Sequence, residues 1–186
     1  FVPPAHSRRL QDYVRLRADH ISRAASHVQH MQKALERMNI KLHDVISSLC
    51  GASGLAVVRA ILAGERAPER LLALCDPQIQ RAKGDRVKEA LRGTWAEEHL
   101  FALRQALQSW EHYQGQIAEC DRQIAQLLPG PDGPNDSGGT PALLTPRKRP
   151  GVNAPDIPQL RSFLAQMCEG RDLTVLPAHT EYSVLQ

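Results

Sequence analysis

The feature that most constrains the fold is a regular spacing of apolar and small residues over residues 10–38. Successive members of this seam lie mostly three or four positions apart, the heptad spacing of a helix that packs lengthwise against another helix. The members are Leu10, Val14, Ile21, Ala24, Val28, Met31, Leu35 and Met38. Arg17 takes the one charged seam position, and we expect it either to mark the edge of a dimer contact or to face a phosphate.

A second heptad seam predicts another long helix over residues 95–128. Its apolar members are Leu100, Leu103, Leu107, Trp110, Ile117, Ile124 and Leu128. Gln114 and Asp121 take its polar positions, and such residues set register and partner number at some cost in stability. We expect the two helices to pack antiparallel, either within one chain or as half of a four-helix dimer. The residues expected to carry this packing are Val14, Ile21, Val28, Met31, Leu35, Leu103, Leu107, Trp110, Ile117 and Ile124.

Shorter helices are predicted between the two seams. Ser7 is a candidate N-cap for the first long helix, and Asn39 is a candidate for its end. Short helices are expected over residues 42–49 and 55–62, from Pro68 onward, and from Asp76–Pro77 to Gly93. Aromatic residues are only 4% of the chain, and apolar alternation with period two is nearly missing, which disfavours strands. The predicted fold is therefore all-α, with two long antiparallel heptad helices and a knob of short ones.

The prolines and glycines predict the domain organisation. Residues 129–158 contain eight prolines and five glycines, a composition typical of a linker without fixed structure. Beyond it, Leu160, Phe163, Leu164 and Met167 restore helical spacing. We expect a helical connector over residues 1–128, a linker over 129–158, and the start of a further domain over 159–186.

Positive charge is concentrated near the first helix. Residues 1–43 contain eight Lys or Arg against three Asp or Glu, a net charge of +5, whereas the whole chain carries +3. Such a face suits nucleic-acid phosphates, and a solvated helix surface explains the pattern equally well. The candidate nucleic-acid-binding residues are Arg8, Arg9, Arg15, Arg23, Lys33, Arg37 and Lys41, with Arg147, Lys148 and Arg149 in the predicted linker.

The remaining chemistry-bearing residues form no recognisable catalytic or metal pattern. His27 and His30 lie one helical turn apart without a carboxylate or cysteine at ligand spacing, so no metal site and no cofactor are predicted. Four scattered cysteines without a CxxC pair, and no signal peptide, favour reduced thiols in a cytoplasmic protein. No apolar run approaches the roughly 20 residues that span a bilayer, so no membrane partner is expected.

Three stretches between residues 33 and 74 resemble a known family. They read Lys33-Ala-Leu-Glu-Arg-Met-Asn-Ile-Lys-Leu42, Gly51-Ala-Ser-Gly54 and Ala63-Gly-Glu-Arg-Ala-Pro-Glu-Arg-Leu-Leu-Ala-Leu74. Their order and spacing closely resemble the middle region of the insertion-sequence one-ten type transposases. Gly170-Arg-Asp-Leu-Thr-Val-Leu-Pro177 is similar to the start of the family's C-terminal domain. Ala178-His179-Thr180 replaces the family's glycines there, and the insert at 129–158 is a further departure.

This resemblance implies a piece of a DNA recombinase. Family members have a RuvC-like domain with four acidic ligands for magnesium, and a C-terminal domain with a nucleophilic serine. These parts would lie before Phe1 and after Gln186, so no catalytic residue and no magnesium are expected here. The helical region between them implies protomer assembly, as a homodimer or higher oligomer, and binding of DNA and structured guide RNA. The alternative is a purely structural dimerisation module, or a decayed transposase remnant, that ignores nucleic acid.

Overall fold

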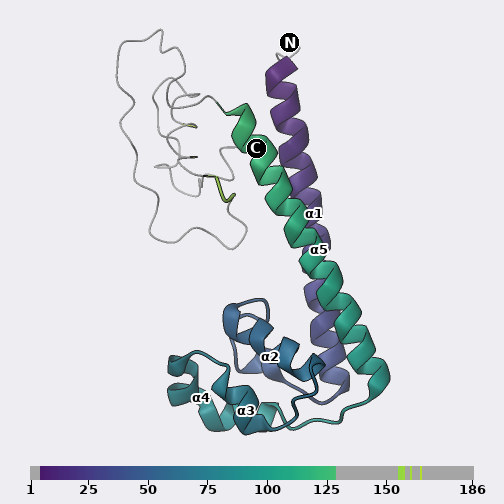
Figure 1. Ribbon diagram of the computed structural model, residues 1–186, viewed down its shortest axis with the longest axis vertical. Coiled ribbons are helices and arrows are strands. Elements are labelled where there is room, and N and C mark those ends of the chain that lie inside the picture. The colour runs from purple at the N-terminus through teal and green to yellow at the C-terminus, as the bar shows by residue number, and fades with distance from the viewer. Residues whose placement is uncertain (1–4, 129–154, 158–159, 161–163, 165–186) are drawn as a thin grey trace. The chain divides into compact units, whose positions relative to one another are not determined.

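Every secondary-structure element that the computed structural model describes is helical (Figure 1). The described residues are 5–128, 155–157, 160 and 164. The elements are α1 (Ala5–Arg37), the 3-10 turn η1 (Leu42–Asp44), α2 (Ala52–Leu62), α3 (Pro68–Ala73), α4 (Pro77–Ala90) and α5 (Glu97–Leu127). The predicted all-α class, with two long helices separated by short ones, is confirmed.

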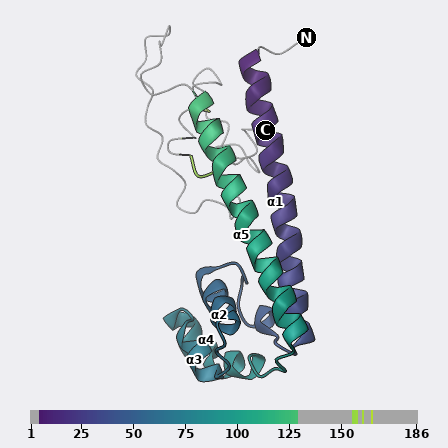
Figure 2. The same ribbon diagram turned by 45° about the vertical axis from the view of Figure 1, so that its right-hand side comes forward.

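Internal contacts divide the chain into two units, and the division falls inside both long helices. The central unit comprises residues 23–112, and the terminal unit comprises residues 1–22 together with 113–186. Within each unit, the segments of α1 and α5 lie side by side and run in opposite directions, as both views show (Figure 1 and Figure 2). The predicted antiparallel packing is therefore present within each unit of the chain.

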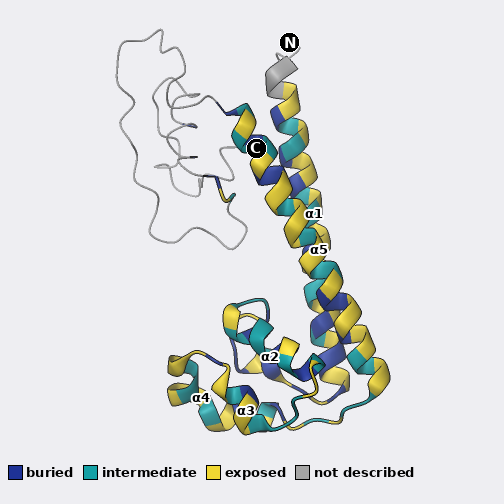
Figure 3. Ribbon diagram, viewed as in Figure 1, coloured by how far each residue is buried: buried dark blue, intermediate teal, exposed yellow. Residues whose placement is uncertain are grey.

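The two heptad seams supply the buried sides of these helix pairs (Figure 3). Val14 and Ile124 are buried in the terminal unit, and Met31, Leu35, Leu103 and Leu107 are buried in the central unit. Ile21 and Ile117 in the terminal unit, and Val28 and Trp110 in the central unit, are half-buried. Seam packing therefore contributes to the core of each unit.

The core of the central unit combines the long-helix seams with the short helices. Its fully buried side chains include Ile40, Leu42, Val57, Ile61, Leu71, Val87 and Leu91. Two glycines allow backbone segments to approach closely in this core. A Cβ atom at Gly54 would lie 2.2 Å from the Leu49 carbonyl oxygen, and one at Gly93 would lie 2.3 Å from the Met38 carbonyl oxygen.

Two helices end in the same hydrogen-bonded turn, the Schellman motif. After α1, the Asn39 N–H donates to the backbone carbonyl oxygen of Glu36, and the Ile40 N–H donates to that of Leu35. Asn39 adopts a φ of 59°. After α2, the Gly64 N–H donates to Ile61 and the Glu65 N–H to Ala60, with φ of 102° at Gly64. Asn and Gly tolerate this left-handed conformation best, so Asn39 is confirmed as the residue that ends the first helix.

The starts of α3 and α4 are marked by residues that are typical of helix N-termini. Pro68 and Pro77 each occupy the first turn, where proline's missing N–H costs no helical hydrogen bond. The Asp76 carboxylate caps α4 by accepting the Gln78 N–H at 2.7 Å. Before α3, the Glu65 carboxylate accepts the N–H groups of Arg66 and Ala67, each at 2.9 Å.

Two local predictions are wrong. Helix α1 begins at Ala5, so Ser7 lies inside the helix and is not its N-cap. The expected helix over residues 42–49 is only the single turn η1. Leu42, Val45, Ile46 and Leu49 are all buried, and this irregular segment reaches the core without helical hydrogen bonding throughout.

The terminal unit has its own apolar cluster. Leu10 and Val14 from α1 pack with Ile124 and Leu128 at the end of α5. Ile157, Leu160 and Leu164 belong to the same cluster. The predicted linker up to residue 154, with Arg147, Lys148 and Arg149, and most of the predicted C-terminal piece lie outside the described residues.

Candidate nucleic-acid interface

The charged seam residue Arg17 has a partner within the chain. Its Nε lies 2.6 Å from Oδ1 of Asp121, and its Nη2 lies 3.4 Å from Oδ2. Both side chains are almost completely buried. Arg17 therefore neither marks the edge of a dimer contact nor faces a phosphate, and both expectations for it are wrong. Arg17 of the first seam is instead matched to Asp121, one of the two polar positions of the second seam.

A third group joins this buried pair. The backbone N–H of Asp156 donates to Oδ2 of Asp121 at 3.1 Å, which connects residue 156 to α5 within the terminal unit. A buried carboxylate is costly unless its oxygens accept hydrogen bonds, and Asp121 accepts them on both oxygens. The pair therefore acts as a structural element of the terminal unit.

The predicted basic residues of the terminal unit remain on its surface. Arg8 and Arg9 are exposed, and neither forms an ion pair with another described residue. Arg15 is also exposed and lies 4.0 Å from Asp12, the limit for an ion pair. An exposed pair at this distance contributes little to stability, so the guanidinium remains available to an external anion.

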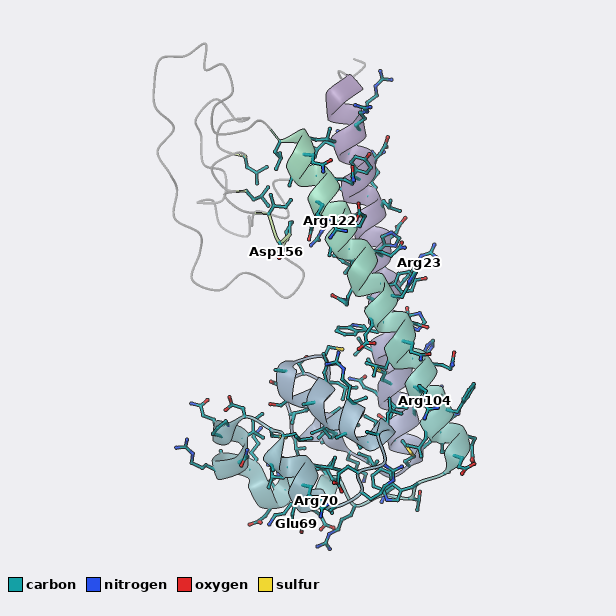
Figure 4. All side chains as sticks on the ribbon, in the orientation of Figure 1. Arg23, Glu69, Arg70, Arg104, Arg122 and Asp156 are labelled. Atoms are coloured by element: carbon teal, nitrogen blue, oxygen red, sulfur yellow. The ribbon has the colours of Figure 1, made fainter. Side chains whose placement is uncertain are left out.

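The predicted basic residues of the central unit are exposed as well. They are Arg23, Lys33, Arg37 and Lys41, and no ion pair joins them to other described residues. Figure 4 shows Arg23 on α1 and Arg104 on α5 on the outside of the helices. Outside α1, Arg59, Arg70 and Arg92 are exposed but bonded to Glu111, Glu65 and Glu89. Arg81, Arg86 and Arg104 are exposed as well, and they form no ion pair with another described residue.

Lys33 and Arg37 line a groove between α1 and α5 of the central unit, with a volume of about 410 Å³. From α1 the groove also receives His27 and His30, and from α5 it receives His99 and Phe101. The other lining residues are Ala34, Ala102, Gln105, Ala106 and Ser109. Because no carboxylate lines the groove, its charge is uniformly positive or neutral.

The groove histidines are not arranged as a metal site. His27 and His30 contact each other edge to face, with ring centroids 5.5 Å apart. No group of three potential metal ligands comes together in the described part of the chain. Burial, followed by the neighbouring His30, lowers the pKa of His27, so its imidazole is mainly neutral at pH 7.

A second hollow of the central unit surrounds Lys41 and has a volume of about 360 Å³. Arg86 and Arg92 line it together with Asp44 and Glu89. Its charges are mixed, and Arg92 is bonded to Glu89. It is therefore less suited to a polyanion than the groove beside Lys33.

The cysteines offer no reactive thiolate among the described residues. Burial raises the pKa of Cys50, Cys75 and Cys120, which keeps each sulfur protonated at neutral pH. They are free thiols, with Cys75 and Cys120 buried.

The family-like residues between 51 and 68 have structural roles. Gly54 allows α2 to pack on the Leu49 backbone, Gly64 ends α2, and Glu65 and Pro68 shape the start of α3. Gly51 is the N-cap of α2, and Ala52–Gly54 lie in its first turn. These residues therefore shape the helical knob of the central unit.

Sequence reasoning missed His99 and Phe101, because it assigned no function to the first turns of α5. A usable signal is the pairing of the charged seam positions Arg17 and Asp121. An antiparallel alignment that sets Arg17 against Asp121 also sets Lys33 against Gln105 and Arg37 against Phe101, and all four of these last residues line the groove.

Comparison of the chain with protein-family models, with curated proteins and with solved structures finds no match. None of the described helices combines the length and the apolar character needed to cross a membrane.

Proposed function

We propose that this chain is a helical module that binds the phosphate backbone of nucleic acid through the basic side chains of α1. We propose further that it serves as the connector of an insertion-sequence one-ten type transposase. Its partners in that setting are DNA, structured guide RNA and a second copy of the chain. The second part of the proposal is supported by the resemblance of residues 33–74 and by the helical knob that they form.

The observation that carries the first part is the number of exposed basic side chains along α1 that lack a carboxylate partner. On α1, the exposed residues Arg8, Arg9, Arg23, Lys33 and Arg37 have no carboxylate partner among the described residues. Outside α1, the exposed Arg59, Arg70, Arg92 and Arg122 each contact a glutamate. The exposed Arg81, Arg86 and Arg104 have no such partner among the described residues, but they are spread over α4 and α5. An unpaired guanidinium can neutralise a phosphate and release its counterion without first losing a partner.

The test compares two variants that change net charge equally. One replaces Arg8, Arg9, Arg15 and Arg23 on α1 by glutamine, and the control replaces the glutamate-bonded Arg59, Arg70, Arg92 and Arg122. The α1 variant should weaken binding of a structured RNA by at least about 100-fold at moderate salt, because lost phosphate contacts act together. The control should change it by less than about fivefold. Fluorescence anisotropy measures both.

Equal weakening in the two variants would show that only net charge matters, and would contradict a specific role for α1. If the wild-type chain does not bind RNA or DNA at all, the module is structural, which is the alternative function. Circular dichroism of each variant checks that its helices are intact.

A further inference from the structure

The groove between α1 and α5 of the central unit contains an exposed aromatic ring beside two cations. Phe101 keeps 59% of its surface exposed, the largest value among the exposed large hydrophobic residues of the described chain. The chain has only three phenylalanines, and this one lies with Lys33 and Arg37 around the same hollow. A lone exposed apolar residue is common on protein surfaces. An exposed aromatic ring inside a basic groove, in contrast, suits a ligand that is both negatively charged and able to stack on the ring.

The charge of the groove defines the first property. Lys33 and Arg37 are exposed and unpaired among the described residues, and no carboxylate lines the hollow. The favourable occupant is therefore an anion, and a cationic or neutral peptide would gain nothing from these side chains.

The aromatic lining defines the second property. Phe101 offers a π-face, and His27, His30 and His99 offer further flat rings around the same volume. An unpaired base stacks on such rings in a sequence-tolerant way, whereas a base inside a duplex has both faces covered by its neighbours. The volume of about 410 Å³ falls within the range of small-ligand sites and is large enough for one nucleotide.

We propose that this groove binds an unpaired nucleotide of single-stranded nucleic acid, with the base stacked on Phe101 and the flanking phosphates at Lys33 and Arg37. The inference rests on the proposed nucleic-acid function and deepens it by naming the strand state that the site takes. The basic residues outside the groove bind phosphates of paired and unpaired strands alike. The groove adds a preference for the unpaired strand.

The test replaces the ring and leaves the charge unchanged. In the whole chain, Phe101→Ala and Phe101→Leu remove the π-face, and the second keeps an apolar side chain. Leu74→Ala is the matched control, because Leu74 is 45% exposed and does not line the groove. Binding is measured by anisotropy with a single-stranded RNA, a single-stranded DNA and a fully paired RNA duplex.

Both Phe101 variants should lose about tenfold in affinity for the single strands, since one base–aromatic stack contributes about 1–3 kcal/mol. Their affinity for the duplex should stay within about twofold, and Leu74→Ala should affect no probe. Loss with single-stranded RNA alone would assign the site to RNA, and loss with both single strands would assign it to any unpaired strand.

Two results would overturn the inference, and they separate it from the proposed function. If the wild type binds all probes and the Phe101 variants bind as it does, or lose affinity equally for single strands and duplex, the groove has no stacking role. The phosphate-binding function then stands. If the wild type binds no probe, both proposals fail. A Phe101→Trp variant gives a direct readout: its added fluorescence should be quenched by single strands and not by the duplex.

Discussion

At the residue scale, the pairing of Arg17 with Asp121 is the most informative contact. Each residue is the charged member of its seam, and together they form a two-point ion pair within the terminal unit. A buried ion pair is weak support for stability, because desolvation offsets much of the attraction. Its advantage is specificity, since any shift of α1 along α5 would leave a buried charge without its partner.

Breaking this pair on one side should destabilise the chain strongly. Arg17→Met leaves the Asp121 carboxylate buried and unpaired, and should lower the free energy of unfolding by about 3–5 kcal/mol. The double variant Arg17→Met with Asp121→Leu should be more stable than either single variant, because no uncompensated charge remains. Urea unfolding followed by circular dichroism measures all three.

The control for this comparison is Arg15→Met. Arg15 is on the same helix, but its side chain is 77% exposed, and the expected change is below about 0.5 kcal/mol. A double variant as unstable as the sum of the single ones would contradict the account, because it would mean that the two side chains stabilise the fold independently.

At the element scale, the short helices depend on close backbone contacts that glycine permits. Helix α2 starts against the Leu49 carbonyl oxygen at Gly54, and the segment after α4 passes the Met38 carbonyl oxygen at Gly93. The 3-10 turn η1 shows the same dependence on packing, because its neighbours are buried although most of the predicted helix is missing. Tertiary contacts, rather than helix propensity, shape this region.

Two glycine substitutions should have opposite effects. Gly54→Ala places a methyl group 2.2 Å from backbone oxygen and should destabilise the chain by about 1–3 kcal/mol. Gly115→Ala, in the middle of α5 with nothing within 4 Å of the new atom, should stabilise it by about 0.5–1 kcal/mol. Thermal or urea unfolding compares them, and a neutral Gly54→Ala would show that the contact is looser than described.

Most of the helices could be predicted from the sequence, because their signals are local. Heptad spacing gave both long helices, Asp76 and the prolines at 68 and 77 marked two starts, and Asn39 marked an end. The partner of Arg17 and the groove at Phe101 could not be predicted from local signals, because both depend on the register between α1 and α5. Arg17 and Asp121 are 104 positions apart in the chain. The groove residues on α1 are more than sixty positions from those on α5. Buried segments without regular hydrogen bonding, such as residues 45–49, also have no periodic signature.

At the scale of the whole molecule, the buried seam residues and the exposed basic residues are separate sets. Leu35 is completely buried in the central core, so Leu35→Asp would disrupt folding and would not report on an oligomer. Replacing the exposed basic side chains of α1 should leave the fold intact, because few internal contacts depend on them. Charge variants on α1 can therefore test function while the fold remains intact.

The most direct test of the central claim is the salt dependence of binding to a structured RNA with an unpaired segment. For the wild type, the logarithm of the association constant should fall linearly with the logarithm of salt concentration. Replacing Lys33 and Arg37 by glutamine should reduce the magnitude of that slope by about 1.4, since each phosphate contact on a single strand contributes about 0.7. The matched pair Arg59→Gln and Arg92→Gln should leave the slope unchanged. A slope that is the same in all three proteins, or no binding by the wild type, would contradict the account.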